Sequence, residues 1–303
     1  MAALQGLAST EGASEESQSL VETVQRHEHD QILVLLGFDG VLTEYEDDPE
    51  AVRLSSARRQ LLRQLMRRPG VTLGVISGRR VHDLRQRVGL GGEVFYIGLH
   101  GLEAVGPRFN RIEHESLRQY RERLHDITMA AQPLISEIDG AHLENKELVL
   151  ALHTRQAGPT DAVWARLHLL RRAGEIADPR TFRMLRGHHV LELLPNLGPT
   201  TAAAIAAVRE CVEQREERRV FVVYVGEDVP ENDAYEATAA HGVSLAVGRR
   251  VRQADYHLES IEMVDELLAR LAALRGRRSP DAPAPRRTAT GVSSPDARWR
   301  KCS

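Results

Sequence analysis

The sequence predicts an α/β protein with a Rossmann-like parallel-sheet core and an inserted α+β cap domain. Apolar runs rich in β-favouring residues alternate with helical patterns, as in parallel sheets that carry helices on both faces. This alternation breaks between about Val105 and Leu194, where a different mixture of helices and strands replaces it. With 303 residues, 42% of them hydrophobic, the chain is long enough for one large domain with an insertion.

Short apolar runs predict the strands of the core sheet, because they are rich in residues that favour β-structure. They are Ile32–Phe38, Val71–Ile76, Val94–Ile97, Val220–Val225 and Val243–Val247. Between them, the segment Ser55–Arg68 is a typical amphipathic helix, with Leu62 and Leu65 on one face. The other predicted core helices are Arg80–Val88, Thr200–Arg215, Asn232–Ala240 and Ile261–Leu274.

The interrupting segment, residues 105–195, is predicted to be the cap domain, and residues 25–104 and 196–274 the core. Within the cap, the patterns predict two helices, a strand and two strand-like runs: Glu113–Ala131, Thr160–Ala173, Glu147–Leu152 and the runs near Phe182 and Val190. Residues 1–24 are small, acidic and aperiodic, so we expect them to be disordered. Residues 275–303 carry eight basic and two acidic residues among many Pro, Ser and Ala, which predicts a disordered basic tail, either a solvated extension or a docking segment.

Composition argues against several classes of protein. The net charge of −3, from 40 basic and 43 acidic residues, gives no sign of a nucleic-acid or membrane partner. Cys211 and Cys302 are too few for a disulfide framework or a metal cluster. No apolar run approaches the roughly 20 residues of a membrane span, and the N-terminus lacks the basic start and apolar core of a secretory signal. We therefore expect a cytoplasmic protein.

Two predicted strands end in residues that suit a phosphate site, and ligands of α/β sheets bind just outside the carboxyl ends of strands. The first strand continues into Gly37-Phe38-Asp39-Gly40-Val41-Leu42. The second ends in Ser77, Gly78 and Arg79, where backbone amides at the start of the next helix can hold phosphate. An ordinary strand-to-helix junction with Ser77 as a helix cap is the alternative.

An acidic loop follows the fourth predicted core strand and begins with Glu227 and Asp228. Carboxylates just past a strand suit Mg²⁺, which prefers hard oxygen ligands. The alternative is a solvated loop before a helix whose first turn favours negative charge.

Several segments resemble the motifs of one enzyme family. Residues 37–42 resemble the Asp-x-Asp-Gly-Thr/Val-Leu signature of haloacid-dehalogenase-type phosphatases, with glycine in place of the first aspartate. Residues 99–103, Leu-His-Gly-Leu-Glu, resemble the Asn-His-Gly-Leu-Glu of trehalose-6-phosphate phosphatases. Residues 143–146, 151–155 and 190–195 resemble cap segments of that family, and residues 223–235 its acidic motif. The motifs occur in family order from about Ile32 to Leu274, so the chain is identified as a member of this family.

The resemblance implies a set of site residues. Asp39 would act as general acid and base and, with Glu227 and Asp228, bind Mg²⁺. Trehalose 6-phosphate, or a related phosphosugar, would be bound by core and cap residues, namely Ser77, Gly78, Arg79, His100, Glu144, Lys146 and Glu192. From the residues alone, His100 could equally be a hydrogen-bonded turn residue, and Glu144 and Lys146 a solvated strand face.

Three departures from the family pattern fall on the chemistry. Gly37 lacks the carboxylate that would form the phospho-enzyme intermediate. Thr200 stands near the position of a lysine and cannot supply its positive charge. Glu227 is one methylene longer than aspartate, so Mg²⁺ binding is expected to be weak or lost. Asp39 cannot replace the nucleophile, because two residues along a strand displace it by roughly 6–7 Å.

The sequence therefore leaves three functions open. The chain could be a non-catalytic protein that binds trehalose 6-phosphate as a sensor or as the regulatory partner of a trehalose-6-phosphate synthase. It could be an active Mg²⁺-dependent trehalose-6-phosphate phosphatase, releasing trehalose and phosphate. It could also be a structural remnant without a site. We favour the first, with phosphatase activity weak or absent.

Overall fold

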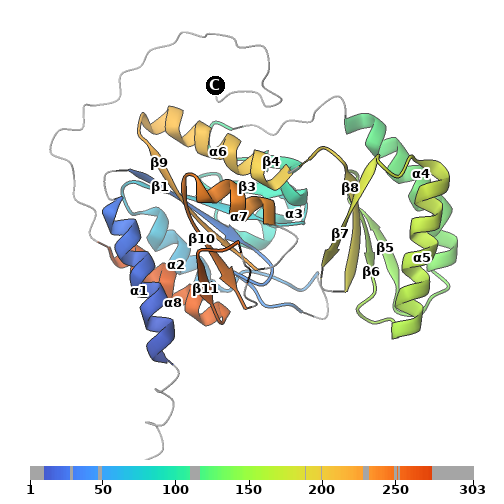
Figure 1. The fold of residues 1–303 in the computed structure, drawn as a ribbon, viewed down its shortest axis with the longest axis horizontal. Helices are drawn as coiled ribbons and strands as arrows, with labels where there is room; N and C mark the ends of the chain where they lie inside the picture. Colours follow the sequence, from blue (N-terminus) through green and yellow to red (C-terminus); the bar gives the residue numbers. More distant parts are fainter. Residues whose placement is uncertain are drawn as a thin grey trace, which may run out of the picture. The chain divides into compact units, whose positions relative to one another are not determined.

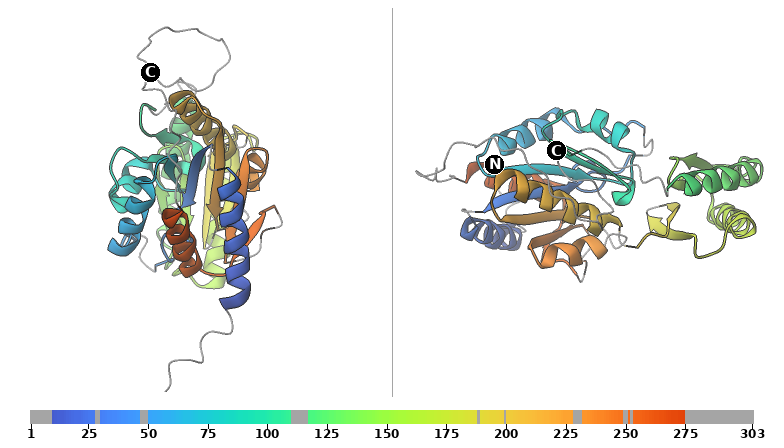
Figure 2. Two further views of the ribbon diagram at one scale, coloured as in Figure 1. Left: turned by 90° about the vertical axis from the view of Figure 1, so that its left-hand side faces the viewer. Right: turned by 90° about the horizontal axis from the view of Figure 1, so that it is seen from above.

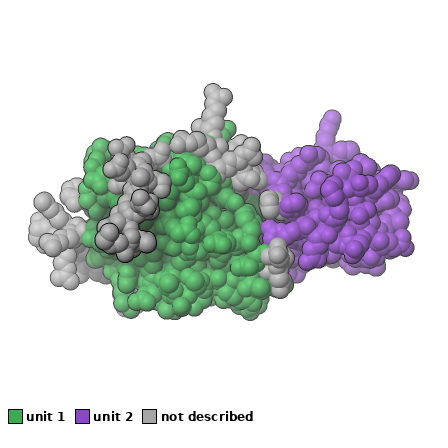
Figure 3. All heavy atoms as spheres, turned by 90° about the horizontal axis from the view of Figure 1, so that it is seen from below, with its two compact units in different colours: residues 1–77, 81–112, 201–303 green, residues 78–80, 113–200 purple. Residues whose placement is uncertain are grey.

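The computed structural model describes residues 10–27, 30–46, 50–109, 117–187, 189–198, 200–227, 232–248, 251 and 253–274. Contacts divide the chain into two compact units, coloured in Figure 3. Unit 1 comprises residues 1–77, 81–112 and 201–303, and unit 2 comprises residues 78–80 and 113–200. Within the described ranges, no helix is long and apolar enough to cross a membrane. The predicted basic tail, residues 275–303, lies outside the described residues.

Unit 1 contains a seven-stranded sheet in the order β11-β10-β9-β1-β2-β3-β4 (Figure 1). Neighbouring strands are parallel except β4, which is antiparallel to β3. The strands are β1 (Gln31–Gly37), β2 (Val71–Ile76), β3 (Phe95–Gly98), β4 (Glu103–Val105), β9 (Val220–Gly226), β10 (Gly242–Val247) and β11 (Tyr256–Leu258). All five predicted core strands are confirmed. The two strands that the sequence did not predict, β4 and β11, lie at the sheet edges and have three residues each.

Helices cover both faces of this sheet (Figure 2), which confirms the predicted α/β architecture. They are α1 (Thr10–Arg26), α2 (Ser56–Met66), α3 (Val81–Val88), α6 (Thr200–Glu216), α7 (Asn232–Ala239) and α8 (Ile261–Ala273), and a 3₁₀ turn, η1 (Leu99–Gly101), follows β3. Successive residues of a strand point to opposite faces. Accordingly Leu36 joins the core formed with α1, α2, α3 and α8, whereas Leu35 joins the core formed with α6 and α7.

Helix α1 lies where the sequence predicted disorder through residue 24. Leu20 and Val24 are four residues apart, so they share one face of the helix, and they are 0% and 5% exposed. The Thr23 hydroxyl also lies 3.3 Å from the Tyr256 hydroxyl of β11. Packing against distant elements therefore stabilises a helix whose composition alone is unremarkable.

Unit 2 contains a four-stranded antiparallel sheet in the order β5-β6-β8-β7. Its strands are β5 (His142–Asn145), β6 (Leu150–His153), β7 (Phe182–Gly187) and β8 (Val190–Pro195). Helices α4 (Arg118–Ile135) and α5 (Pro159–Ile176) share an apolar core with this sheet that includes Leu124, Leu169 and Leu191. In the register Glu144 pairs with Ala151 and Ala151 with Glu192, so both carboxylates project from the same face of the sheet.

Candidate active site

The carboxyl ends of β1 and β2 bring Asp39 and Ser77 together. Gly37 lies beside Ile76 in the register, and the Phe38 amide donates a hydrogen bond to the Ile76 carbonyl at 2.9 Å. Beyond these residues, the Ser77 hydroxyl donates to Asp39 Oδ2 at 3.2 Å. Two predicted site residues thus form a hydrogen-bonded pair at the carboxyl ends of the strands, where α/β proteins bind ligands.

The space beside Gly37 is occupied by Val41. A β-carbon at position 37 would lie 2.9 Å from Val41 Cγ2 and 3.5 Å from the Val225 carbonyl oxygen. The first distance is shorter than real β-carbons tolerate, so one of the two groups would have to move. Val41 is fully buried, and its methyl groups therefore cannot rotate into solvent. The position that carries the nucleophile in the family signature has no carboxylate, and a side chain there would require Val41 to shift.

The carboxylate of Glu227 lies against the turn that follows β1. The Tyr45 hydroxyl donates a hydrogen bond to Glu227 Oε2. A β-carbon at Gly40 would come within 2.1 Å of the same oxygen. Gly40 also has φ of +74°, a backbone conformation that glycine adopts most easily. Sequence reasoning missed Tyr45, because no local pattern connects residues so far apart in the chain.

The structure describes two of the three predicted magnesium ligands, Asp39 and Glu227. Mg²⁺ requires several oxygen ligands in near-octahedral geometry. Asp39 accepts a hydrogen bond from Ser77 and Glu227 accepts one from Tyr45, so protein donors engage both carboxylates. In the part of the chain that the structure describes, no group of three or more His, Cys, Asp or Glu side chains is placed to hold a metal ion. The third predicted ligand, Asp228, lies outside that part.

The Tyr45→Phe substitution is expected to lower the free energy of unfolding by about 1 kcal/mol, because it removes one hydrogen bond at a partly exposed site. Urea denaturation would measure the change. Glu227→Gln, which keeps an acceptor oxygen near Tyr45, is the matched control and should lose less. Equal midpoints for Tyr45→Phe and the native protein would show that the bond contributes nothing in solution.

The turn after β3 fixes His100 through its backbone. Leu99 and His100 have φ of 49° and 54°, a left-handed conformation uncommon for residues with side chains. The His100 amide donates to the Ser77 carbonyl at 3.3 Å, and the His100 carbonyl accepts from Thr201 Oγ1 at 3.1 Å. His100 therefore connects the end of β2 with the start of α6. Contact between its side chain and a phosphosugar stays a prediction.

Glu103, the last residue of the same motif, stabilises the start of α3. Its Oε2 accepts a hydrogen bond from the Val81 amide at 2.9 Å, and the residue is 2% exposed. The first amides of a helix lack partners within the helix, and negative charge there is favourable. Glu103 thus fixes the point at which the chain enters α3 after residues 78–80.

Thr200 is buried and bound to an arginine that the sequence analysis did not find. Arg183 of β7 donates from Nη2 to Thr200 Oγ1 at 2.9 Å. Arg183 Nε is buried and has no hydrogen-bond partner among the described residues. Threonine cannot supply the charge of a lysine. The guanidinium of Arg183, on strand β7, lies beside the Thr200 hydroxyl instead.

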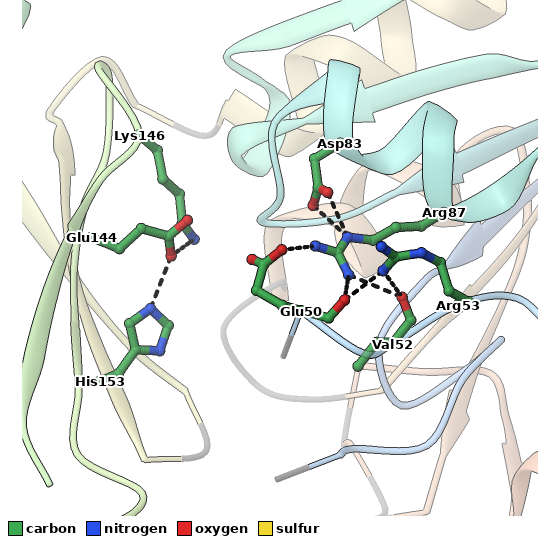
Figure 4. A network of polar contacts seen from close by, with 8 residues as sticks. All are labelled: Glu50, Val52, Arg53, Asp83, Arg87, Glu144, Lys146 and His153. Atoms are coloured by element: carbon green, nitrogen blue, oxygen red, sulfur yellow. Dashed lines mark hydrogen bonds and ion pairs between the residues drawn. The ribbon is translucent and has the colours of Figure 1, made fainter. Parts of the chain in front are cut away.

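Lys146, Glu144 and Glu192 form one charged cluster in unit 2. Lys146 Nζ lies 2.9 Å from Glu192 Oε1 and 3.7 Å from Glu144 Oε2, and it donates to the Gly78 carbonyl at 3.3 Å. Glu144 Oε2 is also 2.9 Å from His153 Nε2 (Figure 4). The side chains of Lys146 and Glu192 are only 10% and 8% exposed, which is the geometry of a buried ion pair rather than a solvated strand face.

Charges within this cluster shift its pKa values. Burial alone would lower the pKa of Lys146, but Glu192 and Glu144 outweigh it and raise that pKa, with the nearby Arg79 charge opposing them. Burial alone would raise the pKa of Glu144, but the hydrogen bond from His153 and the charge of Lys146 lower it. The pair Lys146 and Glu144 is thereby held in its charged form.

Unit 2 is expected to lose stability as the pH falls below neutral. The His142 ring stacks on that of His153 with centroids 4.6 Å apart, and burial followed by the His153 charge lowers the pKa of His142. A group whose pKa is lowered by folding stabilises the fold above its unfolded pKa, and this contribution is lost as the pH falls through the folded pKa. The loss should begin below about pH 6.5 for His142 and below about pH 4.5 for Glu144.

Urea midpoints at neutral and acidic pH would measure this loss. The His142→Gln variant should show a flatter decline below about pH 6.5, because glutamine does not titrate, and His82→Gln, which lies outside the stacked pair, is the control. An identical decline in native protein and His142→Gln would contradict the assignment. The raised pKa of Lys146 acts in the other direction, and its contribution is lost only as the pH rises above about 10.5.

Arg87 of α3 forms a second network, also drawn in Figure 4. Its guanidinium contacts Asp83 at 2.6 Å, the Glu50 carboxylate at 2.8 Å, and the carbonyls of Glu50 and Val52 at 3.0 Å. The Arg87 side chain is 1% exposed. This buried cation fixes the segment before α2 to the helix that follows Ser77, Gly78 and Arg79.

Comparisons with known proteins identify the family of the chain. The sequence profile of the trehalose-phosphatase family matches residues 35–261. The chain is 29% identical over 245 residues to the trehalose-phosphate phosphatase of Mycobacterium marinum, and the match covers 79% of this chain and 61% of that protein. The chain thus spans about three-fifths of the length of the curated relatives that it matches.

Solved structures share the fold at lower identity. The C-terminal domain of Candida albicans trehalose-6-phosphate phosphatase has a TM-score of 0.69 at 21% identity, covering 86% of this chain and 97% of that one. The C-terminal domain of the Candida albicans trehalose synthase regulatory protein has a TM-score of 0.64 at 11% identity, covering 82% and 97%. Because the family profile extends over most of the sequence, this chain belongs to the trehalose-phosphatase family.

Proposed function

We propose that this chain binds trehalose 6-phosphate and hydrolyses it slowly or not at all, acting as a non-catalytic sensor or regulatory partner in trehalose biosynthesis. The observation that carries the proposal is Gly37, which supplies no nucleophile at the position where the family signature has an aspartate. Loss of the nucleophile from a cooperative catalytic site typically costs on the order of 10⁴–10⁶ in rate.

Retained binding is supported by the cluster in unit 2. Lys146 and Glu192 are buried, charged and paired. Removing two charges from water is costly, and an apolar pair of similar size would avoid that cost, so the charges are consistent with a binding role. Carboxylates have several acceptor positions, so Glu192 and Glu144 can accept further hydrogen bonds from sugar hydroxyls. We assign the phosphate to Ser77, Gly78, Arg79 and His100, and the sugar to Glu144, Lys146 and Glu192.

The second candidate function is an active Mg²⁺-dependent trehalose-6-phosphate phosphatase, and the retained pair of Ser77 and Asp39 favours it. In that mechanism Asp39 would deliver a proton to the leaving alkoxide, as general acids do. Without a carboxylate at Gly37, however, water would have to attack phosphorus directly. A trehalose-6-phosphate synthase is the partner that the regulatory role requires, and the fold shared with a protein titled trehalose synthase regulatory protein supports that choice.

Calorimetric titration with trehalose 6-phosphate and an assay of phosphate release with Mg²⁺ would test the proposal together. We expect binding that persists in the presence of a chelator, and phosphate release no faster than in the Asp39→Asn variant. Release by the native protein that disappears in Asp39→Asn would establish the enzyme instead. If the protein neither bound trehalose 6-phosphate nor released phosphate from it, the remaining interpretation would be a structural remnant without a site.

A further inference from the structure

Unit 1 contains a cavity of about 800 Å³ at the opposite end of β2 from the candidate active site. Thr72 lies at its wall near the start of β2, whereas Ser77 follows the end of the strand. Five residues at about 3.3 Å each separate the two positions by about 17 Å. The cavity is therefore a separate place in the fold, and its volume is within the range of small-molecule sites, about 300–1,000 Å³.

Four arginines line this cavity, Arg63, Arg67, Arg108 and Arg215, against the two carboxylates of Glu93 and Glu216. Glu216 is already engaged, because Arg215 Nε contacts its Oε1 at 2.7 Å. Arg67 and Arg108 have no ion-pair partner among the described residues. Among the described residues, the lining therefore carries more positive than negative charge.

Two of these arginines lie close enough for their like charges to repel each other, and a bound anion would reduce that repulsion. Arg63 lies in the last turn of α2 and Arg67 is its C-cap residue, four positions later. Like charges at this spacing face each other and destabilise a helix by a few tenths of a kcal/mol. A helix C-terminus favours positive charge, which accounts for one such residue. An anion between the two would satisfy both.

Thr72 adds a hydrogen-bond donor at the cavity wall. It is 5% exposed, and its hydroxyl oxygen accepts from Gln31 Nε2 at 2.9 Å and from Arg215 Nη2 at 3.1 Å. A hydroxyl accepts at most two such bonds and keeps one hydrogen to donate. No acceptor for that hydrogen is found in the described ranges, so the wall offers a buried donor beside the guanidinium of Arg215.

We propose that this cavity binds a small organic phosphate, such as a sugar phosphate or a nucleotide, at a site distinct from the candidate active site. Guanidinium groups bind phosphate oxygens through paired, charge-assisted hydrogen bonds, which suits Arg63, Arg67 and Arg108 in the lining. The hydroxyl of Thr72 and the charge of Arg215 provide the inner contacts. A neutral sugar would leave the arginine charges unpaired and is excluded.

Calorimetric titration of the full chain with pyrophosphate, which carries the shared anionic chemistry alone, tests this site. The Arg67→Gln/Arg108→Gln variant should weaken pyrophosphate binding by about tenfold to a hundredfold, the expected loss for hydrogen bonds to charged groups. Arg218→Gln removes the same charge close to Glu216 but outside the cavity lining, and should change the affinity less than about twofold. Adenosine triphosphate and glucose 6-phosphate then distinguish a nucleotide from a sugar phosphate.

Three results would overturn the proposal. One is the absence of pyrophosphate binding by the native protein at millimolar concentration. Another is loss of binding in Arg79→Gln but not in the double variant, which would place the anion at the candidate active site. The third is a stronger response to an oligonucleotide than to pyrophosphate with the same variant pattern. Protection of Arg67 and Arg108 from phenylglyoxal by pyrophosphate, read by mass spectrometry, gives a measurement that requires no variant to fold.

Discussion

Replacing Gly37 with aspartate is expected to give no phosphatase activity by itself. The new β-carbon would lie 2.9 Å from Val41 Cγ2, and Val41 is fully buried, so the side chain would be forced out of position. Overpacking of this kind typically costs 1–3 kcal/mol of stability. An attacking carboxylate displaced by as little as about 1 Å loses roughly a hundredfold in rate.

Shortening Val41 should relieve this obstacle. We expect the Gly37→Asp/Val41→Ala variant, assayed for phosphate release from trehalose 6-phosphate with Mg²⁺, to exceed Gly37→Asp alone by at least about tenfold. The matched control is Gly37→Asn/Val41→Ala, which has the same shape but no nucleophile and should remain silent. Equal activity of Gly37→Asp with and without the Val41 change would show that space at this position is not limiting.

Restoring the family's lysine at position 200 would also require a change at Arg183. The Thr200→Lys substitution, which would return the family's charge, places an ammonium group beside the guanidinium of Arg183 that now donates to Thr200. Two cations at that distance repel each other, most strongly in a partly buried site. We therefore expect Thr200→Lys to add activity to the Gly37→Asp/Val41→Ala background only when Arg183 is also changed to glutamine.

Removing Lys146 is expected to have the largest effect on stability. Its Nζ lies 2.9 Å from Glu192, whose side chain is 8% exposed, so a Lys146→Met variant removes the ammonium group that pairs with a buried carboxylate. Breaking a buried pair in this way typically costs about 3–5 kcal/mol. Trehalose 6-phosphate binding should disappear in the same variant, because the cluster would lose its only described ammonium group.

A double-mutant cycle would distinguish the pair from each residue alone. Because Lys146→Met/Glu192→Gln removes both charges, its free energy of unfolding should be higher than that of Lys146→Met by about 1–3 kcal/mol. Equilibrium unfolding in urea gives the values, with Arg186→Gln on the neighbouring strand β7 as a control for an exposed charge. Additive losses in the double variant would mean that the two groups do not interact.

Most of the fold could be predicted because each strand or helix is marked by a hydrophobic pattern within its own short segment of sequence. The run that forms β1 is apolar throughout, and in the structure all seven of its residues are buried, as expected for a central parallel strand. Helix α1 was missed because only a few apolar residues, chiefly Leu20 and Val24, lie among small and acidic ones. What stabilises it is contact with elements more than 200 positions later, and no window of sequence reports that.

The candidate site divides along the same line. The sequence identified Asp39, Ser77, Lys146 and Glu192, and the structure brings them together in pairs. It could not identify Tyr45 or Arg183, since each contacts a site residue through a hydrogen bond between elements far apart in the chain. At position 37 the sequence shows that the carboxylate is missing. Only the structure shows that a β-carbon there would lie 2.9 Å from Val41 Cγ2.

The position of β1 in the sheet has a consequence for the order of events on the ribosome. β1 pairs with β2 on one side and β9 on the other, and about 180 residues separate Gly37 from Val220. At a synthesis rate of about 5–20 residues per second, β1 waits roughly 10–40 s for its second neighbour. Unit 2, whose strands and helices are nearly continuous in sequence, emerges complete during that interval. The edge of β1 that later pairs with β9 therefore lacks its partner strand throughout the synthesis of unit 2.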